Sequence, residues 1–151
     1  MKAKMKKVFK DWVMTSESGS ALYSVSAEGD RLTVRYGTFG DWVARIVLKG
    51  EEAQIILQDR TISAEVTHLP YAHAPLPDKI ISAAFTLDGM PVSIVREGCR
   101  WHITRKDQDV GEIVSGMLSV TMDLSDTAEG LAGILLGLYA AVDRMEKADI
   151  V

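Results

Sequence analysis

Residues 131–145 read LAGILLGLYAAVDRM, and this stretch decides the fold class. From Leu131 to Val142 no residue is charged, so a helix here is apolar on nearly every side. A membrane span needs about 20 apolar residues, and this run is too short to be one. Such a helix must be surrounded by protein, so we predict one buried helix from Thr127 to Lys147.

The flanks and glycines of this helix carry further signals. Asp126 followed by Glu129 favours a helix start, because a side-chain oxygen can accept an orphan N–H and a carboxylate suits the positive end of the dipole. Small residues recur along one stripe, which predicts close packing against a strand: Gly130, Gly133, Gly137, Ala140 and Ala141. The GILLG run also matches the GxxxG pattern of membrane helix pairs, so pairing with a partner helix is an alternative.

Ahead of the helix, the segment from Ala21 to Leu124 has apolar residues at every second position, which is typical of strands with one buried face. For example, Leu32 and Val34 alternate with Arg31, Thr33 and Arg35. Short turn clusters rich in glycine and aspartate separate the runs, which favours an antiparallel meander. We predict a mainly β domain with one C-terminal helix, an antiparallel β-barrel of about 10–12 strands enclosing a central hydrophobic α-helix.

The two remaining segments are irregular. Residues 68–78 read HLPYAHAPLPD, and their prolines favour a loop at the mouth of the barrel. Residues 1–14 form a basic segment, for which we expect a solvated, partly frayed terminus, with a membrane-surface or phosphate-binding arm as the alternative. Its lysines are Lys2, Lys4, Lys6, Lys7 and Lys10. Residues 1–151 are expected to form a single domain.

Composition and charge narrow the class of protein. The chain is 47% hydrophobic and 25% charged with a net charge of −4, which is ordinary for a globular protein and does not favour nucleic-acid binding. Val8 and Phe9 are followed at once by Lys10, so the start does not resemble a secretory signal. A single cysteine, Cys99, fits a reducing compartment, and we expect a cytoplasmic protein.

The order of strands followed by one apolar helix resembles the tubby C-terminal-like superfamily. The resemblance rests on VGEIVSGMLSVTMDL at 110–124, similar to the paired strands before the family's helix, and on LAGILLGLYAAVDRM at 131–145. In length the chain looks closer to the small bacterial and LURP-one-related members than to the tubby proteins or the phospholipid scramblases. The resemblance implies a non-enzymatic binding or scaffolding domain, peripheral at the membrane, whose partner is a phospholipid or phosphoinositide head group or a protein.

Candidate head-group ligands come from the strand pattern, because no basic motif of the tubby type matches residue by residue. Arg31, Arg35, Arg45 and Lys49 face outward on two strands that are neighbours in the sequence. If these strands pair across residues 37–41, Arg35 and Arg45 lie side by side and can bind a phosphate bidentately, with Lys49 on the same strand face. The alternative is charged solvation of a strand face.

The sequence does not favour catalysis. There is no G-x-S-x-G elbow, Walker A loop or G-x-G-x-x-G turn, so we predict neither a catalytic residue nor a cofactor. Cys99 shares the parity of Trp101 and is expected to be buried and inert, while His102 should face outward. The acid pairs Glu51 and Glu52, and Asp107 and Asp109, are expected to be solvated in turns.

Three alternatives remain. His68 and His73 would need at least one more ligand to bind a metal, and Asp78 is the nearest carboxylate. Loop histidines beside prolines are commonly solvated, so a metal site is not expected there. A small enzyme or ligand carrier would place its site at the barrel mouth under the loop of residues 68–78. Self-association would use an edge strand or an exposed apolar patch holding Trp12 and Val13.

Overall fold

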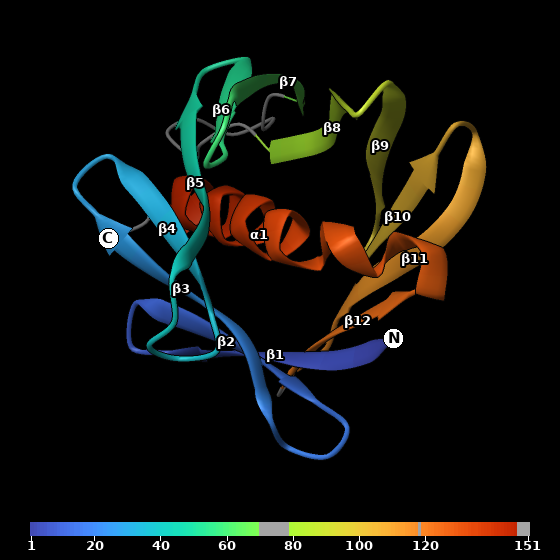
Figure 1. The fold of residues 1–151 in the computed structure, drawn as a ribbon. Coiled ribbons are helices and arrows are strands. Elements are labelled where there is room, and N and C mark those ends of the chain that lie inside the picture. Colours follow the sequence, from blue (N-terminus) through green and yellow to red (C-terminus); the bar gives the residue numbers. More distant parts are fainter. Residues whose placement is uncertain (70–78, 118, 148–151) are drawn as a thin grey trace.

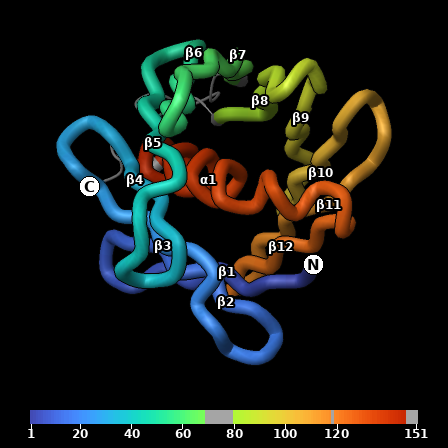
Figure 2. Tube along the Cα trace, in the orientation of Figure 1, coloured from blue at the N-terminus to red at the C-terminus, as the bar shows by residue number. Residues whose placement is uncertain are grey.

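The computed structural model describes residues 1–69, 79–117 and 119–147. Twelve strands form one closed antiparallel barrel, in which consecutive strands pair and β1 also pairs with β12 (Figures 1 and 2). The strands are β1 (Lys2–Val8), β2 (Asp11–Ser16), β3 (Ala21–Glu28), β4 (Arg31–Tyr36), β5 (Trp42–Lys49), β6 (Glu52–Ile56), β7 (Thr61–Leu69), β8 (Lys79–Leu87), β9 (Met90–Glu97), β10 (Arg100–Arg105), β11 (Gln108–Ser115) and β12 (Val120–Leu124). A short 3-10 helix, η1 (Asp126–Leu131), and an α-helix, α1 (Ala132–Lys147), follow.

The predicted mainly β barrel with one C-terminal α-helix is confirmed. Two of its strands, β1 and β2, precede the segment in which strands were expected. The prediction that the basic N-terminal segment is solvated and partly frayed is therefore wrong. Ala3 and Met5 of β1 are buried, and Lys4 lies between Thr121 of β12 and Thr15 of β2. Barrel closure orders this segment, because pairing on both sides satisfies its backbone hydrogen bonds.

The predicted helix from Thr127 to Lys147 begins differently from the expectation. Its first turn is the 3-10 helix η1, and the N-cap residue Ser125 makes no side-chain capping hydrogen bond. Instead, the ammonium group of Met1 lies 3.5 Å from a carboxylate oxygen of Asp126 and 3.7 Å from one of Glu129. The two carboxylates at the start of the helical segment thus also hold the N-terminus.

The residues of α1 are largely buried and belong to the same hydrophobic core as inward side chains of all twelve strands. Leu135 and Leu136 are fully buried. The helix contacts β3, β4, β5 and β8, and in Figure 1 it crosses the middle of the view. At its end, Lys7 Nζ lies 3.0 Å from Asp143 Oδ2. Among the described residues, no helix has the length and apolar character needed to cross a bilayer.

Candidate anion-binding wall

The outer surface of β4 and β5 carries the two arginines of the predicted anion site. Thr33 pairs with Arg45, and after a register shift Arg35 pairs with Trp42. Arg35 and Arg45 are therefore diagonal neighbours rather than a directly opposed pair. Because diagonal positions remain within reach of long side chains, both guanidinium groups can act on one anion.

A carboxylate of the chain itself already pairs with one of these arginines. Arg35 Nη2 donates to Glu28 Oε1 at 3.0 Å. This hydrogen bond, helped by the charges of Arg35 and Arg45, lowers the pKa of Glu28. The Cζ atom of Arg45 lies 4.1 Å from the ring centroid of Trp42, a cation–π contact that helps to position the guanidinium group. An external anion at this pair must compete with Glu28.

Lys49 is not part of this arrangement. It is the last residue of β5, it is exposed, and it pairs with Glu52 of β6. Arg45 lies four residues away on the same face of the strand, at roughly 13 Å for extended backbone. The structure thus places two of the three predicted residues near each other and separates the third.

A row of lysines on β1 was not among the predicted site residues. Lys2, Lys4 and Lys6 are exposed and alternate with the buried Ala3 and Met5. Within the described part of the chain, none of the three lysines makes an ion pair. The signal in the sequence was the period-two spacing of the lysines, which is typical of the solvent face of a strand.

Cross-strand pairing connects the lysine row to the arginines. Lys6 pairs with Val13, Val13 with Ser24, and Ser24 with Arg35. With strands about 4.8 Å apart, the backbones of Lys6 and Arg35 are roughly 14 Å apart, and only small side chains stand between them in this row. We call the surface formed by Lys2, Lys4, Lys6, Arg35 and Arg45 the basic wall.

The outer surface of β6 to β12 has the opposite charge. Its outward positions carry carboxylates at Glu52, Glu65, Glu97, Asp109, Glu112 and Asp123, against a cation at Arg100. Arg100 is itself paired with Glu112, with 2.9 Å between Nη1 and Oε2. The net charge of −4 is therefore distributed unevenly: the basic wall is positively charged, and the outer surface of β6 to β12 is negatively charged.

Two other predictions about single side chains are wrong. Cys99 is exposed, because β10 begins only at Arg100 and Cys99 belongs to the turn after Gly98, where strand parity does not apply. Trp12 is 7% exposed and packs edge-on against Tyr139, with 5.4 Å between ring centroids, so it is not part of an exposed apolar patch. His102, which was expected to face outward, lies beside Glu97, with 3.4 Å between Nε2 and Oε2.

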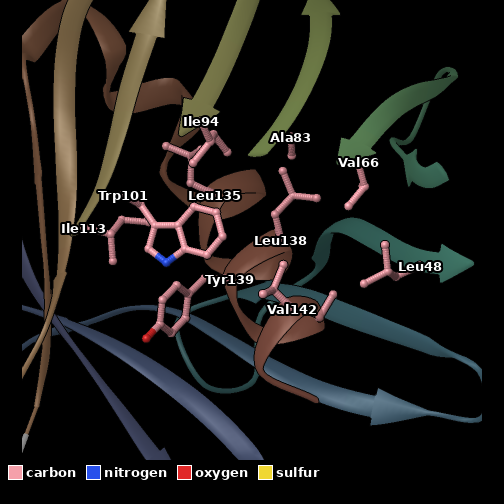
Figure 3. Close-up of a pocket in the computed structure, with 11 residues that line it drawn as sticks. Leu48, Val66, Ala83, Ile94, Trp101, Ile113, Leu135, Leu138, Tyr139 and Val142 are labelled. Atoms are coloured by element: carbon pink, nitrogen blue, oxygen red, sulfur yellow. The ribbon is translucent and has the colours of Figure 1, made fainter. Parts of the chain in front are cut away.

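One hollow between α1 and the strands is small and apolar. A hollow of about 20 Å³ is lined by apolar side chains that include Trp101, Tyr139 and Val142 (Figure 3). This volume is enough for about one water molecule, and the lining offers it no polar partners. This hollow is therefore too small to hold a substrate.

The predicted loop site lies mostly outside the described residues, as do His73 and Asp78. His68 is described, and its Nε2 lies 2.5 Å from the carbonyl oxygen of Gly50. No group of His, Cys, Asp and Glu side chains in residues 1–69, 79–117 and 119–147 is arranged to hold a metal ion.

Comparison with known proteins leaves the geometry as the guide to function. No family model matches the chain, and neither a curated protein nor a solved structure is significantly similar to it.

Proposed function

We propose that this chain is a non-enzymatic binding module that docks on anionic phospholipid head groups through the basic wall. The observation that carries the proposal is the separation of charge around the barrel. Lys2, Lys4 and Lys6 project from one side without an ion-pair partner among the described residues, while carboxylates dominate the other side. Such a charge distribution orients the molecule with β1 to β5 toward a negative surface.

The strength of this interaction comes mainly from the lysines. A lysine close to an anionic membrane contributes about 1 kcal/mol at physiological ionic strength, and the contribution falls as salt is added. Arg35 and Arg45 contribute less, because Glu28 already neutralises part of their charge. Binding through the wall should therefore be moderate, reversible and sensitive to salt.

The fold supports binding on the outside of the barrel. In this proposal α1 fills the barrel interior, an inference that rests on its burial and on the shared core of helix and strands. The assignment to the tubby C-terminal-like superfamily belongs to the same proposal, and its support is the order of twelve antiparallel strands followed by one apolar helix. The chain would then act as a cytoplasmic module, peripheral at the membrane.

Vesicle flotation tests the proposal. The wild-type protein should float with vesicles of phosphatidylcholine containing phosphatidylserine or a phosphoinositide and stay behind with phosphatidylcholine alone. Lys2→Gln, Lys4→Gln and Lys6→Gln combined should weaken binding by about 100-fold, which corresponds to three lysines at about 1 kcal/mol each.

The matched control removes three cations that lie outside the basic wall, through Arg60→Gln, Arg100→Gln and Lys106→Gln. These changes alter the net charge equally, so this variant should lose much less affinity than the wall variant. An equal loss in both variants would mean that only net charge matters. That result, or wild-type protein that ignores anionic vesicles, would contradict the proposal.

A further inference from the structure

A cleft of about 590 Å³ opens at the end of the barrel where α1 terminates. It lies between the turn joining β1 to β2, the turn joining β3 to β4, and the last turns of α1. Pockets that bind small molecules usually measure about 300–1,000 Å³, so this cleft is of a suitable size. None of its lining residues belongs to the basic wall.

The floor of the cleft is apolar. Trp12, Val25, Leu32 and Ala140 line it, and each of them is at most 7% exposed. Trp12 is held in place by its edge-on contact with Tyr139 of α1. A floor of this kind favours a ligand with a hydrocarbon portion, because burying apolar surface is its main source of affinity.

Phe9 stands at the lip of the same cleft. Its side chain is 95% exposed, and its φ of 58° is in the left-handed region, which a bulky residue rarely adopts. A polar residue or glycine would suit both the exposure and the backbone angle better. Phe9 therefore extends the apolar surface of the cleft outward at a position where stability does not require an aromatic ring.

The rim of the cleft is positively charged. It carries three cations, Lys7, Lys10 and Arg144, and one carboxylate, Asp143. That carboxylate lies 3.0 Å from Lys7, and Arg144 Nη2 donates to the carbonyl of Gly29 at 3.4 Å. Lys10 is exposed and has no ion-pair partner among the described residues. Lys10 and Arg144 are thus available to an anionic group at the mouth.

From this combination we propose that the cleft binds a single-chain amphipathic anion. The hydrocarbon chain lies across Trp12 and Leu32, with Phe9 over its outer part. The head group, a carboxylate or a phosphate monoester, is bound by Lys10 and Arg144. Both head groups offer the same chemistry to these cations, which donate charge-assisted hydrogen bonds to oxygen. The inference does not depend on the proposed function, since it uses no residue of the basic wall.

Titration with single-chain amphiphiles below their micelle concentrations tests this site. Isothermal titration calorimetry should detect one molecule of dodecanoate or of dodecyl phosphate per chain, and much weaker binding of dodecyltrimethylammonium. The two anions together show whether a carboxylate or a phosphate is preferred. Bromododecanoate should quench tryptophan fluorescence, and Trp12→Phe should remove most of this quenching while retaining an aromatic ring against Tyr139.

Two variants distinguish binding at this cleft from unspecific hydrophobic binding. Lys10→Gln with Arg144→Gln should weaken dodecanoate by about tenfold, the effect of two partly exposed charge contacts, whereas Lys2→Gln with Lys4→Gln should leave it unchanged. Both side chains at the rim are exposed, so thermal unfolding should confirm a folded variant. Equal binding of the cationic amphiphile, unchanged binding in the rim variant, or no binding of either anion would overturn the proposal. None of these results bears on vesicle binding by the wall.

Discussion

Arg96 Nη1 lies 2.7 Å from Glu146 Oε1, and this oxygen also accepts the backbone N–H of Ile80 at 3.0 Å. The side chains of Arg96 and Glu146 are 22% and 16% exposed, so the ion pair is largely shielded from water. Arg96 also lies over the ring of Trp101, 5.0 Å from its centroid. One carboxylate near the end of α1 thereby ties the helix to β8 and β9.

We predict that Glu146→Ala destabilises the protein by about 1–3 kcal/mol, because Arg96 and the Ile80 N–H then lose a shared acceptor in a half-buried place. Urea unfolding at neutral pH measures this loss. Glu112→Ala is the control, since its pair with Arg100 is exposed and should contribute less than about 1 kcal/mol. Equal losses in the two variants would show that Glu146 does not anchor the helix.

The glycines of the helical segment should respond differently to alanine. A Cβ on Gly137 would lie 2.8 Å from side-chain atoms of both Ile46 and Val34, whereas a Cβ on Gly130 meets nothing within 4 Å. Alanine gains about 1 kcal/mol of helix propensity, but overpacking costs about 1–3 kcal/mol. Gly137→Ala should therefore lower the free energy of unfolding and Gly130→Ala should not. If Gly137→Ala stabilises the protein, α1 does not pack tightly on β4 and β5.

Removing Glu28 should strengthen binding of anions to the basic wall. Glu28→Gln frees Arg35 from its carboxylate partner and removes a negative charge that acts on Arg45, so affinity for anionic vesicles should rise a few-fold at neutral pH. Glu112→Gln makes the same charge change on the negatively charged outer surface of β6 to β12 and should have a smaller effect. Similar gains from both variants would indicate that the arginine pair is not a contact site.

The same carboxylate predicts an acid dependence of stability. The folded pKa of Glu28 is lowered, first by the hydrogen bond from Arg35, so its contribution is present above its unfolded pKa and is lost as pH falls through the folded pKa. Wild type should therefore be more stable than Glu28→Gln at neutral pH, and the difference should vanish in acid. Urea unfolding of both proteins across this range checks the sign.

The phenol of Tyr23 predicts that stability depends on pH in the alkaline range. Burial raises its pKa above the usual value of 10.0, and the nearby Tyr36 and Glu129 add to the shift. Its contribution to stability is complete below the unfolded pKa and is lost as pH rises through the folded pKa. Tyr23→Phe should unfold less readily than wild type as pH increases above 10. Ultraviolet titration of Tyr23→Phe should lack one phenol that ionises at high pH in the wild type. If the two proteins lose stability equally as pH rises, the raised pKa of Tyr23 is contradicted.

Local sequence patterns were sufficient for the main elements. Alternation in runs such as Leu32 to Tyr36 predicted strands, because a strand with one buried face must repeat every two residues. The uncharged run from Leu131 to Val142 predicted the buried helix for a similar reason, since its side chains have no polar face to expose. Strand alternation gave the wrong prediction for Cys99, because the strand begins one residue later. Only the geometry of the turn decides that boundary.

The sequence by itself thus determined a mainly β chain ending in one apolar helix, since both features follow from the periodicity of neighbouring residues. The tertiary structure alone decided that β1 closes the barrel against β12, because that pairing joins residues more than a hundred positions apart and leaves no local pattern. It also decided that Glu28 pairs with Arg35 and that the lysine row continues toward the two arginines. Those relationships depend on the register of four strands, which no single stretch of sequence specifies.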